Sequence, residues 1–266
     1  MPSLKLYQVD AFTDQVFRGN PAAVVPLEAW LPDITLQAIA AENNLAETAF
    51  FVPKGTGYHL RWFTPRQEVP LCGHATLATA YVILRHLTPL APRVEFTTLS
   101  GPLAVTRAGD GFTLDFPRLE LTPVPVPPAA LAEGLGRQPV QVLETSGDPN
   151  YYAVYPHEAD VRALRPDLVI LESLHPFGVV ATAPGIATDI VSRYFAPGYG
   201  IPEDAVTGSI HCALTPWWAA RLGRTELTAY QASERGGTLR CRLEGSRVYL
   251  TGSAALFLEG TIALDS

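Results

Sequence analysis

The stretch Arg61-Trp-Phe-Thr-Pro65, followed by Pro70-Leu-Cys-Gly-His74 and an apolar segment, recurs in altered form later in the chain. The second copy reads Arg193-Tyr-Phe-Ala-Pro197, then Pro202, then Thr207-Gly-Ser209 and another apolar segment. Both copies run from an arginine with two aromatic residues, through two prolines, to a glycine with a polar residue. Chance similarity is the alternative, but the shared order favours two copies of one α/β unit.

Apolar side chains follow each of the two glycines at helical spacing. They are Leu77, Ala80, Tyr81 and Leu84 in the first copy, and Ile210, Leu214, Trp217 and Leu222 in the second. This spacing predicts one helix from near Gly73 and another from Gly208. A shorter helix is predicted from Asp33, a good N-cap residue, to about Asn43.

Strand-like segments surround these helices. Residues 58–63 alternate with the period of a strand, and residues 94–98, 103–107 and 112–116 also have strand character. The segment Ala108-Gly-Asp-Gly111 is a hairpin signal between the last two. The sequence therefore predicts an α+β fold of two pseudo-symmetric halves, each a sheet with a central helix.

The segment Leu121-Thr-Pro-Val-Pro-Val-Pro-Pro128 divides the two copies. Proline has a fixed φ and no N–H, so this segment should be extended and outside any central strand. We therefore expect an N-terminal half of residues 1–120, a linker of residues 121–128 and a C-terminal half of residues 129–266.

Composition excludes several classes of protein. The chain has 266 residues, 47% of them hydrophobic and 17% charged, which is typical of a globular protein with its own core. Its net charge of −7 argues against nucleic acid and acidic membranes as partners. Neither a signal peptide nor an apolar membrane span is recognisable, and three cysteines in a chain of this length do not form a disulfide framework. A cytoplasmic location is expected.

Gly73-His74 and Gly208-Ser209 lie where the two central helices should begin. Glycine lets a ligand approach the backbone, and the first turn of a helix offers unpaired N–H groups and a partial positive charge. Ordinary capping explains either helix start alone, whereas the duplication favours two starts facing one cleft. Such a pair would hold a carboxylate and stabilise an enolate-like anion.

Two acidic residues are candidates for proton transfer. Glu47 precedes the apolar run Ala49-Phe-Phe-Val52, where burial would favour its protonated form and suit a general base. The alternative is a solvated glutamate at a strand end. Asp204, next to Glu203, either acts as a second acid/base or orienting group, or only complements the helix dipole.

No metal is expected, although zinc uses the residue types of Cys72, His74, His211 and Cys212. Their spacing fits no zinc pattern. His211 and Cys212 should also lie inside a helix, where adjacent side chains point about 100° apart.

The segment Gln231-Ala-Ser-Glu-Arg-Gly-Gly237 contains a glycine pair, Gly236 and Gly237, for which two structures are plausible from the sequence. The pair forms either an anion-holding nest or a turn before a strand. The sequence has no Walker loop and no glycine-rich dinucleotide motif between a strand and a helix, so no nucleotide cofactor is expected.

Taken together, these motifs resemble the PhzF-like family of phenazine-biosynthesis isomerases, from about residue 4 to residue 262. The resemblance is carried by Val9-Asp-Ala-Phe-Thr13 with Gly19-Asn-Pro-Ala-Ala23, the Glu47 segment, Pro70-Leu-Cys-Gly-His-Ala-Thr76, Glu203-Asp-Ala-Val-Thr-Gly-Ser209 and Gln231-Ala-Ser-Glu-Arg-Gly-Gly237. It implies the diaminopimelate epimerase fold, in which each half is a barrel-like sheet wrapped around its central helix. Members are often dimers, so a homodimer is one state that the resemblance implies.

The resemblance also implies roles for individual residues. Glu47 matches the family's general acid/base, and His74, Asp204 and Ser209 match its other active-site groups. The expected substrate contacts are made by Gly73, Gly208, Asn20, Gly236 and Gly237. Cys72, His211 and Cys212 receive no role.

One departure from the related epimerases bears on mechanism. Those enzymes use two facing cysteines, whereas this chain has Cys72 at the first position and Thr207 at the second. A threonine hydroxyl is too weakly acidic for that role near neutral pH. We therefore predict a cofactor-independent isomerase of a small carboxylate substrate. The alternatives are an epimerase or racemase of an amino or hydroxy acid, and a non-catalytic metabolite-binding protein.

Overall fold

The computed structural model describes residues 3–145 and 148–264, and the chain divides into two compact units. The first unit comprises Met1–Asp115 and Thr251–Ser266, and the second comprises Phe116–Leu250.

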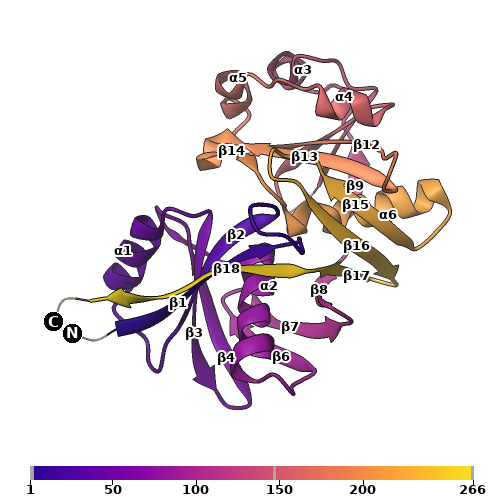
Figure 1. The fold of residues 1–266 in the computed structure, drawn as a ribbon. Helices are drawn as coiled ribbons and strands as arrows, with labels where there is room; N and C mark the ends of the chain where they lie inside the picture. The colour runs from indigo at the N-terminus through magenta and orange to yellow at the C-terminus, as the bar shows by residue number, and fades with distance from the viewer. Residues whose placement is uncertain (1–2, 146–147, 265–266) are drawn as a thin grey trace. The chain divides into compact units, whose positions relative to one another are not determined.

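The first unit is a mixed sheet with two helices (Figure 1). Its elements in chain order are β1 (Ser3–Ala11), β2 (Asn20–Pro26), α1 (Asp33–Asn43), β3 (Glu47–Lys54), β4 (Gly57–Phe63), β5 (Glu68–Val69), α2 (Gly73–Val82) with a π-helical turn (Ile83–Leu87), β6 (Arg93–Thr98), β7 (Gly101–Ala108), β8 (Gly111–Pro117) and β18 (Ala254–Ala263).

The second unit has a similar order of elements, with more short helices. They are β9 (Leu121–Pro123), α3 (Ala129–Leu135), β10 (Gln141–Thr145), β11 (Asn150–Val154), α4 (Glu158–Arg162), α5 (Leu168–Glu172), β12 (Gly178–Pro184), β13 (Ile190–Ala196), a 3-10 turn (Pro197–Tyr199), β14 (Ile201–Asp204), α6 (Gly208–Leu222), β15 (Glu226–Gln231), β16 (Gly237–Glu244) and β17 (Arg247–Gly252).

The two units pair their strands in the same sequence of directions. In the first, β1–β2 is antiparallel, β2–β3 parallel and β3–β4 antiparallel, and β4 then pairs antiparallel with β5 and parallel with β6. In the second, β10–β11, β11–β12, β12–β13, β13–β14 and β13–β15 repeat this series. The repeat read from the sequence is therefore present in the strand topology, with α2 and α6 as equivalent helices.

Each unit contains one helix that is buried along most of its length. In α2 every residue from 74 to 80 is buried, and the helix packs against β1, β2, β3 and β18. In α6 residues 210–216 are buried, and the helix packs against β9, β15 and β16. A helix that is apolar on all sides belongs in a core, which explains why a sheet covers more than one of its faces.

A matching arginine–glutamate pair in each unit holds the hairpin before the central helix. Arg61 binds Glu68 through two hydrogen bonds of 2.7 Å each. Arg193 binds Glu203 through bonds of 2.7 and 2.9 Å. Bidentate pairs of this kind fix geometry as well as charge. The arginine that both copies of the repeat share therefore orients β5 in one unit and β14 in the other.

Most sequence-based element predictions are confirmed, with three differences. Residues 251–266 group with the first unit rather than with the predicted half 129–266, because β18 pairs with β1 from Ala263 opposite Ser3 to Ala254 opposite Ala11. The Pro-rich segment starts as the short strand β9, which pairs with β10. Asp33 is not the N-cap of α1: Pro32 holds that position, and the Asp33 carboxylate binds Arg61 at 2.9 Å.

Across the two described ranges, no helix is long and apolar enough to cross a membrane.

Candidate active site

Glu47 and His74 meet inside the first unit. Glu47 is the first residue of β3, and His74 is the second residue of α2. Glu47 Oε2 lies 3.1 Å from His74 Nε2, and the two side chains are only 12% and 5% exposed. Among the described residues, neither atom has a partner with good hydrogen-bond alignment. Their contact is therefore one of charge, and both atoms keep hydrogen-bonding capacity for a ligand.

The other edge of the His74 ring is held by two neighbours. The side-chain amide nitrogen of Asn20, at the start of β2, lies 3.2 Å from Nδ1, and Cys72 Sγ lies 3.5 Å from the same atom. Asn20 is 1% exposed. This contact indicates that Asn20 orients His74, and its predicted contact with substrate stays a prediction.

The charges in this cluster set its protonation states. Burial lowers the pKa of His74, but Cys72 and Glu47 raise it by more, so the net pKa lies well above its ordinary value. Burial, with the charge of Glu47, raises the pKa of Cys72 to about 11. At neutral pH the thiol is therefore protonated and cannot serve as a base, whereas Glu47 can face an imidazolium.

Glu47, Cys72 and His74 also carry potential metal ligand atoms within 4.8 Å of one another. The thiol lies near Nδ1 and the carboxylate near Nε2, so they approach different edges of the ring. The absence of a metal stays a prediction.

In the second unit, Asp204 belongs to a network that precedes α6. Thr207 Oγ1 donates to Asp204 Oδ2 at 2.5 Å. Gln231 is fully buried, accepts from the Thr207 N–H at 2.8 Å, and donates to the Asp204 carbonyl at 2.9 Å. Gln231 received no role of its own from the sequence, since β15 also contains the polar residues Glu226 and Thr228 and only tertiary structure distinguishes Gln231 from them.

The two helix starts have the same local geometry. Cys72 and Thr207 are the N-cap residues, both with extended backbone, and neither side chain caps its helix. Gly73 and Gly208 are the first helical residues, and Ser209 follows with an exposed side chain. Each first turn therefore has N–H groups not satisfied by the N-cap side chain. That Gly73 and Gly208 face one cleft stays a prediction.

Gly236 and Gly237 lie at the junction of β15 and β16. Gly236 has a φ of +67°, and a Cβ there would lie 2.0 Å from the Tyr230 hydroxyl oxygen. Its N–H donates to Ser233 Oγ at 3.0 Å. These features favour the turn over the anion nest, and contact of either glycine with substrate stays a prediction.

His211 and Cys212 are buried in α6. His211 Nδ1 lies 2.7 Å from the Thr207 carbonyl oxygen, and burial lowers its pKa to about 4. The neutral ring therefore donates from Nδ1 to that carbonyl. Cys212 Sγ lies 3.9 Å from the Gly208 carbonyl oxygen. Both residues support the start of α6 from within the core.

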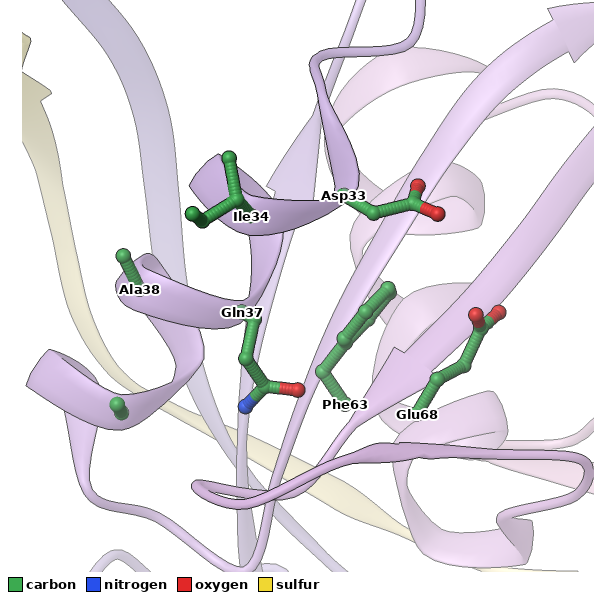
Figure 2. A pocket seen from close by; sticks show the side chains of 7 residues that line it. Asp33, Ile34, Gln37, Ala38, Phe63 and Glu68 are labelled. Carbon is green, nitrogen blue, oxygen red and sulfur yellow. The ribbon is translucent and has the colours of Figure 1, made fainter.

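A hollow of about 540 Å³ lies elsewhere in the first unit, beside α1 (Figure 2). Its lining comprises Asp33, Ile34, Gln37, Ala38, Ala41, Phe63 and Glu68. Both of its carboxylates bind Arg61, and it contains none of the predicted site residues. The hollow therefore shares no residue with the Glu47 cluster.

The repeated units define a protein of the epimerase-like fold class. A hydroxyproline epimerase from Agrobacterium vitis superimposes with a TM-score of 0.64 at 12% identity, covering 99% of this chain and 93% of that one. This likeness concerns the fold alone and confirms the predicted fold class. The chain belongs to the family of phenazine biosynthesis-like proteins, whose sequence profile it matches over residues 9–260.

Close relatives agree with this family assignment. A PhzF-family phenazine biosynthesis protein from Enterococcus faecalis has a TM-score of 0.95 and 45% identity, covering 99% of this chain and all of that one. A Pseudomonas aeruginosa protein named as an uncharacterized isomerase is 49% identical, covering 98% of this chain and 99% of its own length. The predictions of family and of an isomerase-class enzyme are confirmed.

Proposed function

We propose that this protein moves a proton between carbons of a small carboxylate substrate, with Glu47 as the acid/base and without a cofactor. The observation that carries the proposal is the buried pair of Glu47 Oε2 and His74 Nε2, whose hydrogen-bonding capacity is not used by the described residues. A buried carboxylate beside a histidine, with an unused oxygen, is the geometry that a general base requires.

The proposed reaction conserves atoms and charge. Glu47 removes a proton from a carbon next to an unsaturated or carbonyl-bearing group, and the electron pair moves into the adjacent π system. The carboxylic acid then returns the proton to a different carbon. His74, held by Asn20 at Nδ1, keeps the carboxylate in place before the transfer.

The helix starts contribute fixed partial charge. The N–H groups at Gly73 and Gly208 begin helices whose N-cap side chains leave them open. Such groups stabilise a developing anion without reorganisation. Asp204 and Ser209, at the start of α6, are proposed as the remaining active-site groups.

An epimerase or racemase is the second candidate, because this fold class includes such enzymes. A two-thiol mechanism is disfavoured, since Thr207 occupies the N-cap position equivalent to Cys72 and its hydroxyl donates to Asp204. A non-catalytic binding protein is disfavoured by the buried base, for which a binder has no use.

The test is hydrogen exchange at carbon. The protein is incubated in deuterated water with a panel of unsaturated carboxylates, hydroxy acids and amino acids, and deuterium incorporation is followed by NMR and mass spectrometry. Glu47→Gln keeps the size of the side chain but cannot take the proton, so exchange should fall by roughly two to four orders of magnitude. Glu42→Gln, at an exposed glutamate near the end of α1, is the matched control and should retain full activity.

Binding and folding are measured separately. Glu47→Gln should still bind the substrate and melt near the wild-type temperature. Undiminished exchange in Glu47→Gln would remove Glu47 from the mechanism. Migration of deuterium to a second carbon identifies isomerisation, whereas exchange with inversion at a single carbon identifies epimerisation.

A further inference from the structure

The two repeats share a hydrogen bond that holds the segment before each central helix. Ser233 Oγ donates to the Ala205 carbonyl at 2.7 Å, and Ser100 Oγ donates to the Pro70 carbonyl at 2.8 Å. Each serine lies two residues beyond the end of a strand, β15 or β6, and each carbonyl lies two residues before an N-cap. This bond therefore belongs to the scaffold that both repeats inherit.

Three other equivalent positions differ together between the repeats. The first position is the last residue of β6 or β15, which is Thr98 in the first unit and Gln231 in the second. The second is the residue paired with Trp62 or Tyr194, which is Val69 or Asp204. The third is the N-cap of the central helix, which is Cys72 or Thr207. In the first unit Thr98 Oγ1 donates to Gly101 in its own turn. Only in the second unit are all three positions joined by side-chain hydrogen bonds.

The donors and acceptors in the second unit leave one consistent arrangement. Gln231 Oε1 must face the Thr207 N–H, so its Nε2 group donates both to the Asp204 carbonyl and, at 3.1 Å, to Thr207 Oγ1. Because Thr207 Oγ1 accepts from Gln231, its single hydrogen is free to point at Asp204 Oδ2, 2.5 Å away. This engagement also explains why threonine, a good N-cap residue, does not cap α6.

We propose that Gln231 is a positioning residue, which orients the Thr207 hydroxyl so that it donates to the Asp204 carboxylate and fixes that carboxylate for its role in the active site. The assignment of Asp204 to the active site rests on the proposed function, but the orientation by Gln231 does not. Gln231 is fully buried, so water cannot replace its amide without opening the core. The Gln231–Gly237 motif thus holds the Asp204–Thr207 segment in place through hydrogen bonds made by Gln231 and Ser233.

The test follows the titration of the Asp204 carboxyl carbon by NMR, in protein labelled with ¹³C-aspartate and assigned with Asp204→Asn. No substrate is needed. Thr207→Val deletes the donor and should raise the titration midpoint of Asp204 by roughly one pH unit, since a hydrogen bond to the ionised form is lost. Gln231→Leu should raise it by a smaller amount, because the hydroxyl is present but no longer oriented. Thr215→Val, which removes a buried hydroxyl elsewhere in α6, is the control and should leave it unchanged.

The double variant Gln231→Leu/Thr207→Val decides the proposal. If Gln231 acts through the hydroxyl, the double variant titrates like Thr207→Val alone. Charged and titratable groups near Asp204, among them Tyr194 across the β13–β14 pair and Glu203 with its partner Arg193, are the same in every variant. An unchanged midpoint in Gln231→Leu, or a fully additive shift in the double variant, would overturn the proposal.

Failure of the proposed function gives a different pattern. If the protein catalyses no exchange at carbon with any substrate, the titration shifts are still expected. If exchange occurs, Gln231→Leu should lower the exchange rate and shift the pH profile of that rate in the same direction as the titration midpoint of Asp204. If Gln231 has only a structural role, the substitution should lower the melting temperature and leave the pH profile unchanged.

Discussion

The buried His211 ring makes the stability of this protein depend on pH. Burial lowers the pKa of His211 from 6.5 to about 4, while in the unfolded chain it titrates near 6.5. The unfolded state therefore binds one more proton between these values, so stability is full above pH 6.5 and is lost as the pH falls toward 4. A difference of about 2.5 pKa units corresponds to about 3 kcal/mol in total, and about 2 kcal/mol of it is lost between pH 7 and pH 5.

The substitution that isolates this effect is His211→Asn. Asparagine can place an amide near the position of Nδ1 and donate to the Thr207 carbonyl, but it does not titrate. The variant should be less stable than wild type at pH 7 because the smaller side chain leaves a cavity. Its further loss on going to pH 5 should be smaller than that of wild type by about 2 kcal/mol.

The assay is urea unfolding at pH 7 and pH 5, followed by circular dichroism and tryptophan fluorescence. His86→Asn, at an exposed histidine, is the control and should keep the wild-type pH dependence. His74 does not confuse the comparison: its raised pKa contributes stability that is lost as the pH rises above 6.5, and this loss is the same in wild type and in both variants. Parallel losses for wild type and His211→Asn would refute a neutral, buried His211.

Two further predictions concern the cluster around Glu47. Cys72→Ala should retain activity within about tenfold, since the thiol has a pKa raised to about 11 and cannot be the base near neutral pH. The check is to measure the rate of exchange at carbon for Cys72→Ala and for Glu47→Gln under the same conditions. An inactive Cys72→Ala together with an active Glu47→Gln would reverse the roles of the two residues. Chelation and exhaustive dialysis should leave full activity, because the proposed proton transfer by Glu47 needs no metal. A loss of activity that zinc restores would contradict this.

Local sequence was sufficient for the elements that carry the candidate site residues. The spacing of apolar residues after Gly73 and Gly208 marks α2 and α6, and the apolar run after Glu47 marks β3. These patterns are readable because helix and strand periods are properties of a short window. The duplicated arginine motif likewise predicted a repeat that the strand pairings now show.

The ends of the two units could not be assigned in the same way. Residues 251–266 belong with the first unit because β18 pairs with β1, a contact between opposite ends of the chain. The amino-acid composition of β1 or of β18 does not identify the strand with which it pairs, since many strands of this chain would present a similar apolar face.

The sequence by itself therefore determined the fold class, the two central helices and the residues from which a site could be built. Tertiary structure alone decided which of those residues meet. Parallel pairing of β2 with β3 and packing of α2 bring Asn20, Glu47 and His74 together, and the end of β15 places Gln231 against Thr207. The physical reason is distance along the chain. Side-chain periodicity depends only on residues that are close in the sequence. A hydrogen bond between residues tens of positions apart depends on strand register and helix packing, which are set only when the whole sheet has formed.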